Sequence, residues 1–234
     1  MKFLIINADD FGYGCGVNRA IAELHDQGVV TSASLMVNTP STAEGVAMAA
    51  ARPGLSVGLH VNFTNEAQRL VDFDDPAVCR RELRRQFDHF VALTGRPPTH
   101  LDSHQHVHRR PPCQPSFLEL AAEHGLPLRD RAPVTFKGGF YGQWEYGISE
   151  QEKVSFDALT SIVSTELRRG IYELAVHPGY LDAAAEYVYH RDREWERATL
   201  ADPRLPALLR DQAVELISYH ELQRAVACLD GGAA

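Results

Sequence analysis

The sequence has few cysteines, no long hydrophobic run and no run of basic residues. Its four cysteines are widely separated and none forms a Cys-x-x-Cys pair, so neither a zinc knuckle nor a redox motif is indicated and we expect reduced thiols. No apolar segment approaches the roughly 20 residues that a membrane-spanning helix requires. The net charge is -8 with His neutral. This charge argues against a nucleic-acid partner, because binding to phosphate groups depends on Lys and Arg.

Several catalytic motifs are also absent. The chain has neither a Gly-x-Ser-x-Gly nucleophile elbow nor a P-loop, and the glycines of residues 12–16 do not complete a dinucleotide-binding motif. The apolar run at residues 3–6 is too short for a signal peptide and is followed by two aspartates. We therefore expect a cytoplasmic protein. Its catalytic residues are expected outside these common motifs.

The order of the predicted elements indicates an α/β fold. Apolar segments of strand length alternate with amphipathic segments of helix length along the 234 residues, as in a parallel sheet with crossover helices. About seven strands fit a distorted (β/α) barrel, and an open doubly wound sheet is the alternative. We assign residues 1–230 to one domain and expect residues 231–234 to fray. The predicted strands span residues 2–8, 31–37, 55–61, 99–103, 126–129, 171–176 and 214–219. The predicted helices span residues 17–27, 41–51, 76–93, 116–124, 156–169 and 220–229.

Polar residues gather where the predicted strands end. The carboxyl ends of parallel strands form one edge of the fold, and active sites lie at that edge. Clusters that are distant in sequence are therefore expected to meet there. The clusters are Asp9 with Asp10, His60 with Asn62, residues 102–108, and His177 with Pro178 and Gly179.

The first cluster is a pair of adjacent aspartates. Neighbouring residues on an extended chain point to opposite sides, so Asp9 and Asp10 are expected to have different roles. One can bind a cation while the other faces a water or a cationic side chain. Taken alone, the pair also fits a turn or a helix cap, which is a common use of aspartate.

The histidines favour a metal site over a turn. His100, His104, His106 and His108 lie within nine residues, with Asp102 among them. Imidazole and carboxylate groups together are typical zinc ligands. The spacing does not select the ligands, because an extended chain and a helical turn would place different members on one face. We expect at least one member to orient a ligand instead of binding the metal.

His177 stands where a strand gives way to a turn. A rigid position at the edge of the site suits a general acid, and a structural imidazole in the turn fits the sequence equally well.

These residues together resemble the YdjC-like carbohydrate deacetylase family. The resemblance runs in order along nearly the whole chain and is weakest at residues 131–156. The combination of the Asp-Asp-Phe-Gly motif with the histidine-rich motif is highly specific. The matching motifs are NADDFG (7–12), GVN (16–18), GVVTS (28–32), VGLHVN (57–62), PTHLDSHQHVH (98–108), HPGY (177–180) and LISY (216–219).

The resemblance implies a distorted TIM-barrel-like fold and one divalent metal ion, Mg or Zn. It implies that Asp10, His60 and His104 bind this metal, and that the reaction removes acetyl groups from N-acetylglucosamine units of chito-oligosaccharides or related compounds. A branch of the family acts in hopanoid biosynthesis, so the resemblance implies one reaction type and more than one class of substrate. Members are typically cytosolic and often dimeric, which implies a homodimer.

The mechanism expected from these roles uses Asp9 as general base and His177 as general acid. The metal polarises the acetamide carbonyl and stabilises the tetrahedral oxyanion. The aromatic side chains of Phe63, Tyr141 and Trp144 are expected to stack on a sugar face. The remaining residues expected to contact the substrate or to support the site are Asn62, Asp102, His106, His108 and Arg129.

Three other interpretations compete with this one. The first is a deacetylase or amidohydrolase acting on a compound other than chitin fragments. The second is a metal-dependent phosphoesterase, for which the sequence shows no clear phosphate-binding cluster beyond Arg109-Arg110. The third is a sugar-binding relative without activity, which the presence of every motif residue disfavours.

Overall fold

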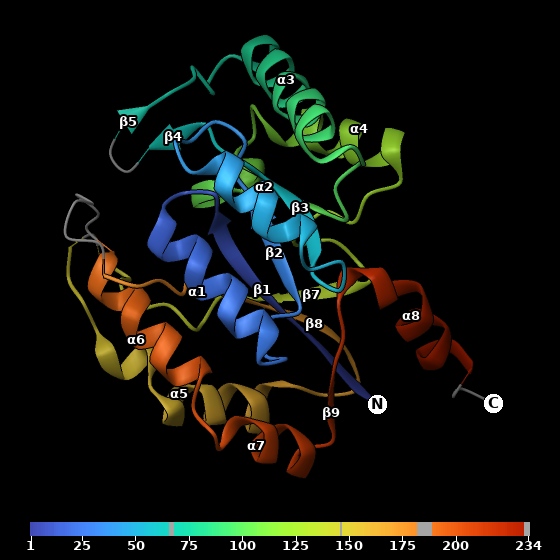
Figure 1. Cartoon of the computed structure of the whole chain (residues 1–234). Coiled ribbons are helices and arrows are strands. Elements are labelled where there is room, and N and C mark those ends of the chain that lie inside the picture. The colour runs from blue at the N-terminus through green and yellow to red at the C-terminus, as the bar shows by residue number, and fades with distance from the viewer. Residues whose placement is uncertain (66–67, 146, 182–188, 232–234) are drawn as a thin grey trace.

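The sheet of this protein is parallel and curled, and helices cover its outer side (Figure 1). The computed structural model describes residues 1–65, 68–145, 147–181 and 189–231. The strand order is β6-β3-β2-β1-β8-β7, and β9 pairs with β1, while β4 and β5 form a separate antiparallel hairpin. The strands are β1 (Lys2–Phe11), β2 (Ser32–Leu35), β3 (Ser56–Val61), β4 (Thr64–Asn65), β5 (Gln68–Arg69), β6 (Leu101–Ser103), β7 (Val134–Lys137), β8 (Gly170–Val176) and β9 (Val214–Leu216).

The helices α1 and α2 lie against the sheet, α3 packs on α4, and α8 packs against β8 (Figure 1). None of them, within the described residues, has both the length and the apolar character needed to cross a membrane. The α-helices are α1 (Cys15–Asp26), α2 (Thr42–Ala50), α3 (Pro76–Thr94), α4 (Gln114–His124), α5 (Phe156–Ser161), α6 (His190–Leu200), α7 (Leu205–Asp211) and α8 (Leu222–Asp230). Short 3-10 helices cover His104–Arg109, Gln151–Val154 and Tyr219–Glu221, and a π-helix covers Ile162–Glu166.

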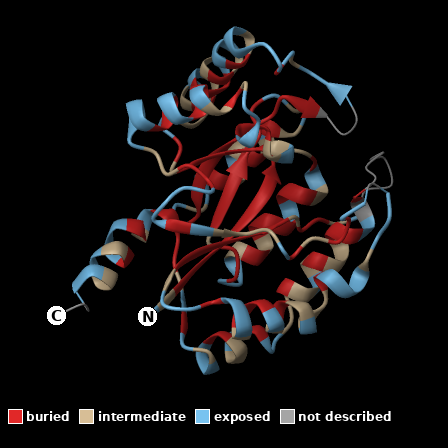
Figure 2. Cartoon of the chain, turned by 180° about the vertical axis from the view of Figure 1, so that it is seen from behind, coloured by how far each residue is buried: buried red, intermediate tan, exposed pale blue. Residues whose placement is uncertain are grey.

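The central strand β1 is buried on both sides (Figure 2). Leu4 and Ile6 belong to the large apolar core that includes residues of α1 to α4. Phe3 and Ile5 point the other way, into a smaller core that includes residues of α8. This alternation follows from the pleat of a strand. The alternation continues to the end of β1, where the side chains that point into the curl are polar.

His100 is a buried polar side chain that packs against β3. The ring of His100 packs so closely on Gly58 that a Cβ there would lie 2.3 Å from it. Glycine is therefore required at this position of β3. His100 also stacks on Tyr219, with ring centroids 4.0 Å apart. Burial lowers the pKa of His100 to about 4, so it is a neutral structural side chain at pH 7.

The prediction of a distorted (β/α) barrel is confirmed, in the form of a curled half-barrel. The edge strands β6 and β7 do not pair with each other. Residues 126–129, predicted as a strand, contribute only the bridge between Leu101 and Leu128. All four cysteines are free thiols, and the buried sulfurs of Cys79 and Cys113 lie 2.9 Å apart.

Several parts of the sequence prediction were wrong, and helix α7 was not predicted at all. The helix predicted for residues 156–169 ends at Ser161 as an α-helix and continues as a π-helix. Strand β7 and the hairpin β4–β5 were missed because both are very short. Helix α6 was missed because most of the residues that it buries are charged, so no apolar stripe marks it. The charged ones are Asp192, Arg193 and Glu196, and Leu200 at the end of the helix is also buried.

Candidate active site

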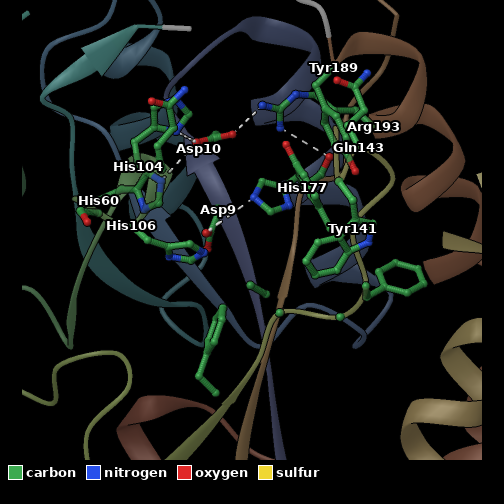
Figure 3. A pocket seen from close by; sticks show the side chains of 18 of the residues that line it. Asp9, Asp10, His60, His104, His106, Tyr141, Gln143, His177, Tyr189 and Arg193 are labelled. Atoms are coloured by element: carbon green, nitrogen blue, oxygen red, sulfur yellow. Dashed lines mark hydrogen bonds and ion pairs between the residues drawn. The ribbon is translucent and has the colours of Figure 1, made fainter. Parts of the chain in front are cut away.

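A pocket of about 580 Å³ opens at the carboxyl ends of the parallel strands (Figure 3). The predicted convergence of the strand-end clusters is confirmed, because residues from the ends of β1, β3, β6 and β8 line this one cavity. The predicted site residues that line it are Asp9, Asp10, His60, His104, His106, Tyr141, Trp144 and His177.

The two aspartates at the end of β1 point to different partners. Asp9 continues the strand and faces Arg129, which contacts both of its carboxylate oxygens. Asp10 adopts a left-handed backbone conformation, with φ of 64°, and faces His60 and His104 instead. A non-glycine residue in this region is uncommon and often marks a functional position. The two carboxylates are both buried, but they occupy separate parts of the site.

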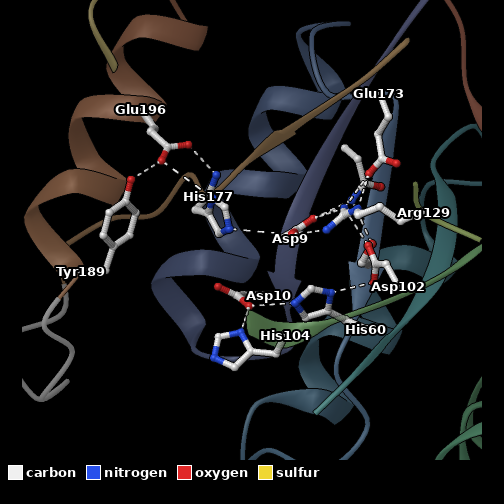
Figure 4. Close-up of polar contacts among 12 residues, drawn as sticks. Asp9, Asp10, His60, Asp102, His104, Arg129, Glu173, His177, Tyr189 and Glu196 are labelled. Carbon is white, nitrogen blue, oxygen red and sulfur yellow. Dashed lines mark hydrogen bonds and ion pairs between the residues drawn. The ribbon is translucent and has the colours of Figure 1, made fainter. Parts of the chain in front are cut away.

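Asp10 is the centre of a cluster of metal-ligating groups (Figure 4). Its Oδ1 lies 3.2 Å from His60 Nε2 and 2.9 Å from His104 Nδ1. The three ligand atoms lie within 4.8 Å of one another. Its other oxygen, Oδ2, accepts a hydrogen bond from Arg193 Nη2 at 2.5 Å. Burial opposes ionisation of Asp10, but Arg193 and His104 together hold its pKa well below the usual value.

His60 connects this cluster to a second carboxylate. Its Nδ1 lies 2.7 Å from Asp102 Oδ1, which leaves Nε2 directed at Asp10. A carboxylate on the outer nitrogen of a ligating imidazole fixes the orientation of the ring. Burial lowers the pKa of His60, but the charges of Asp102 and Asp9 outweigh it and raise the pKa to about 10. Both ring nitrogens of His60 therefore face carboxylates.

The residues present fit a divalent cation. Two imidazole nitrogens and one carboxylate oxygen are a donor set found in catalytic zinc sites, and three protein ligands leave positions for water and substrate. A second group, formed by Asp9, His60 and Asp102, also has ligand atoms within 4.8 Å in the described residues. Arg129 already binds both of its carboxylates, so we favour the group around Asp10.

Arg129 is a buried hub behind the pocket. Its guanidinium contacts Asp9, Asp102 and Glu173 at 2.5 to 2.7 Å. Glu173 also accepts a hydrogen bond from Tyr219 Oη at 2.8 Å. Burial raises the pKa of Asp9, but the charge of Arg129 outweighs it and holds the pKa below the usual value. Asp9 is therefore ionised at neutral pH and held in a fixed orientation.

His177 faces Asp9 from the end of β8. Its Nε2 lies 3.7 Å from Asp9 Oδ2, and its ring meets the edge of Tyr141 at 5.2 Å between centroids. Its backbone N–H donates to Glu196 Oε2 at 2.5 Å, which ties the turn after β8 to α6. Burial lowers the pKa of His177 to about 4, so the ring is neutral at pH 7.

The histidine-rich segment is divided between the pocket and the structure behind it. Gln105 and His106 both have positive φ, of 50° and 53°, so the segment is neither a strand nor a regular helical turn. This irregular backbone sends His104 and His106 into the pocket. His108 lies behind the wall, where its Nδ1 lies 2.6 Å from Ser103 Oγ. The sequence alone could not make this division.

Two predicted substrate contacts lie away from the pocket. Phe63 has no exposed surface and packs in the core against Phe117, so its predicted role in stacking on a sugar is wrong. Asn62 does not line the cavity either. Its backbone hydrogen-bonds Gln86 and its side chain bonds Asn38, so it fastens the end of β3.

Several pocket residues were not predicted from the sequence. Tyr189 and Arg193 both line the cavity. Glu196 lies just behind it and accepts a hydrogen bond from Tyr189 Oη at 2.5 Å. Burial raises the pKa of Glu196 to about 8. All three belong to α6 or directly precede it, and no local motif marks them.

Comparison with known proteins assigns the chain to a family. The model of the YdjC-like protein family matches residues 3–211. A carbohydrate deacetylase of Brevibacillus brevis is 34% identical over 94% of this chain and 99% of the relative. A chitooligosaccharide deacetylase of Serratia marcescens is 33% identical, with the same coverage. A solved structure from Enterococcus faecalis, named for cellobiose-phosphate cleavage, has a TM-score of 0.78 and 26% identity over 94% of this chain and 98% of its own. The chain belongs to the YdjC-like protein family.

Proposed function

We propose that this protein is a metal-dependent deacetylase of N-acetylated sugars, of the chito-oligosaccharide type. The observation that carries the proposal is the convergence of Asp10, His60 and His104 in a pocket that Asp9 and His177 also line. Relatives named carbohydrate and chitooligosaccharide deacetylases match along nearly their whole length, which supports the same reaction here.

Asp10, His60 and His104 would hold one divalent ion. When bound, this ion polarises the acetamide carbonyl and lowers the pKa of a coordinated water. Two imidazole ligands favour zinc or another transition metal, and carboxylate with water also suits magnesium. Asp102 orients His60 through Nδ1, and Arg193 occupies the second oxygen of Asp10. Asp10 can therefore offer one oxygen to the ion.

Asp9 and His177 would move the proton. Asp9 accepts it from the attacking water, while Arg129 keeps the carboxylate in place. The low pKa of Asp9 means that it holds this proton only briefly. His177 is neutral at rest and close to Asp9, so it can receive the proton and deliver it to the departing amine nitrogen. The products are acetate and a free amino sugar.

The opposite wall would bind the sugar. Tyr141 and Trp144 line the pocket, and Trp144 is 61% exposed. Exposed aromatic rings at a cavity mouth offer flat apolar surfaces that fit the face of a pyranose ring. His106 lies on the other side of the pocket with its ring against Phe136, where it can contact a substituent of the same sugar.

A phosphoester substrate is the main competing hypothesis. Two guanidinium groups, those of Arg109 and Arg193, line the described part of the pocket. Both are paired with carboxylates, Arg109 with Asp130 and Arg193 with Asp10. A phosphate group would have to displace these partners, so the geometry favours a neutral acetamide. An N-acylated substrate from another pathway, such as hopanoid synthesis, remains a variant of the same proposal.

Acetate release from N-acetylated chito-oligosaccharides tests the proposal. The wild-type protein is assayed as purified, after chelation, and after addition of Mg or Zn, with a sugar phosphate as the competing substrate. We expect acetate release that stops on chelation and returns with one of the metals. Phosphate release without acetate, or acetate release that survives complete removal of metal, would contradict the proposal.

The resemblance also leaves two predictions about the state of the protein. We propose a cytoplasmic homodimer that takes no nucleic-acid partner. Light scattering after size-exclusion chromatography measures the mass directly, and a value equal to the 26.0 kDa of one chain would reject the dimer.

A further inference from the structure

One wall of the pocket is a loop with little regular structure. Residues 138–149, here called the wall loop, carry Tyr141 and Trp144. In its described residues, 138–145 and 147–149, the loop has no helix or strand beyond the single bridge between Glu145 and Ile148. Such a loop keeps a defined position only if side chains from elsewhere hold it.

The contacts that hold the loop come from the first turns of α6. Asp192 has no exposed surface, and its Oδ2 accepts hydrogen bonds from Gln143 Nε2 at 2.7 Å and from Ser149 Oγ at 2.9 Å. One carboxylate oxygen therefore joins the two arms of the loop.

Tyr189, just before α6, makes a second contact. Its hydroxyl accepts a hydrogen bond from the backbone N–H of Gly142 at 2.7 Å, and its ring stacks on Tyr141 with centroids 4.6 Å apart. A Cβ at Gly142 would lie 2.9 Å from Asp192 Oδ1 and 3.2 Å from Tyr189 Oη. The loop backbone thus passes directly over these two side chains, and a side chain at position 142 would force one of them or the loop to shift.

The same turn of α6 also reaches the proposed metal site. Arg193 follows Asp192 in the sequence and donates to Asp10, on the other side of the pocket (Figure 3). Consecutive residues of α6 therefore position the wall loop and the carboxylate at the reacting centre. This fixes the distance between the aromatic wall and that centre.

We propose that Asp192 is a positioning residue that sets the binding of a sugar ring against Tyr141 and Trp144. This inference rests on the proposed deacetylase function and adds to it. Asp192 has no direct contact with the reacting group. It determines how strongly the pocket binds the sugar, because it holds the loop that carries Tyr141 and Trp144.

The test compares Asp192→Ala with Asp192→Asn. Asparagine keeps an oxygen that accepts both hydrogen bonds, and alanine removes it. We expect Asp192→Ala to raise KM for N-acetylated chitotriose about tenfold, the effect of losing roughly one hydrogen bond, with kcat within about threefold. Asp192→Asn should restore most of the wild-type KM. Glu194→Ala is the control, since Glu194 is the nearby acid on α6 outside the pocket lining.

A second measurement does not depend on catalysis. Hydrogen–deuterium exchange of the ligand-free protein, read on peptides covering residues 138–149, reports whether the loop is held. Asp192→Ala should speed exchange of this segment, and Asp192→Asn and Glu194→Ala should leave it unchanged. Gly142→Ala should reproduce the effect of Asp192→Ala, because its Cβ would push the loop from α6.

The two measurements separate the inference from the function on which it rests. Wild-type protein that releases no acetate overturns the proposed function, and the exchange data still decide whether Asp192 holds the loop. If acetate is released and Asp192→Ala changes neither exchange nor KM, the inference is wrong and the function stands. A fall in kcat with unchanged KM would also reject it, because that result places the role of Asp192 at the reacting centre.

Discussion

Arg129 binds both carboxylate oxygens of Asp9, through Nη1 to Oδ2 at 2.7 Å and Nη2 to Oδ1 at 2.6 Å. This bidentate contact fixes the orientation of the carboxylate and keeps it ionised. Asp10 contacts a different set of partners, His60, His104 and Arg193. The geometry therefore gives the two aspartates separate chemical tasks, which single substitutions can separate.

Asp9→Asn should remove catalysis without removing the metal site. A positioned general base contributes about 10²–10⁴-fold to rate, so we expect kcat to fall by at least about 100-fold. Metal content should remain at the wild-type level, because Asp9 is outside the group formed by Asp10, His60 and His104. Acetate release and elemental analysis measure the two quantities. Full activity in this variant would rule out Asp9 as the base.

Replacing Arg129 should affect stability more than any change at the pocket mouth. Arg129→Met leaves Asp9, Asp102 and Glu173 buried without their shared cation. Removing one partner of a buried ion pair costs about 3–5 kcal/mol of unfolding free energy. Arg109→Met is the control: its bond to Asp130 is exposed, and such pairs contribute less than about 1 kcal/mol. Urea denaturation measures both, and equal losses would contradict the prediction.

Metal binding should raise the melting temperature of the wild-type protein. A ligand that binds only the folded state stabilises it by mass action, by about 2.7 kcal/mol at 100 times its Kd. Asp10→Asn and His104→Ala should each remove this response to added Zn or Mg. We choose His104 for substitution instead of His60, because His60 also holds Asp102 by a hydrogen bond and its loss would disturb a second carboxylate. A melting temperature that rises equally in wild type and in both variants would place the metal elsewhere.

The sequence predicts the half of this site that lies on strand ends and not the half that lies on α6. Asp10 and His104 follow apolar strands, so topology alone brings them to one edge. Arg193 and Glu196 lie on a helix whose buried face is charged, so hydrophobic periodicity gives no signal there. His106 lines the pocket and His108 does not. This difference depends on two residues with positive φ, which the spacing of the histidines cannot reveal.

Glu196 should make stability fall as the pH rises. Burial raises its pKa from an ordinary value of 4.5 to about 8, so between these values the folded state holds a proton that the unfolded state has lost. The contribution of Glu196 is therefore fully present below about pH 4.5 and is lost as the pH approaches 8. Glu196→Gln cannot ionise, and its side chain can still accept from the His177 N–H.

Urea denaturation at several pH values between 5 and 8 compares the two proteins. The free energy of unfolding of the wild type should fall relative to that of Glu196→Gln across this range. Other titrating groups are common to both proteins and cancel in the difference. A difference that does not change with pH would show that Glu196 is ionised throughout.

Trp144→Ala should weaken substrate binding and leave the fold intact. The side chain is 61% exposed and lines the pocket, so its removal leaves no buried cavity. Contacts between flat rings contribute about 0.5–1.5 kcal/mol beyond area burial, which corresponds to roughly two- to tenfold in KM. Trp144→Phe keeps an aromatic ring, so its KM should lie between those of Trp144→Ala and the wild type. Because the ring lies on the wall opposite Asp10 and His104, kcat should change little. A loss confined to kcat would place Trp144 at the reacting acetamide and remove it from the sugar-binding wall.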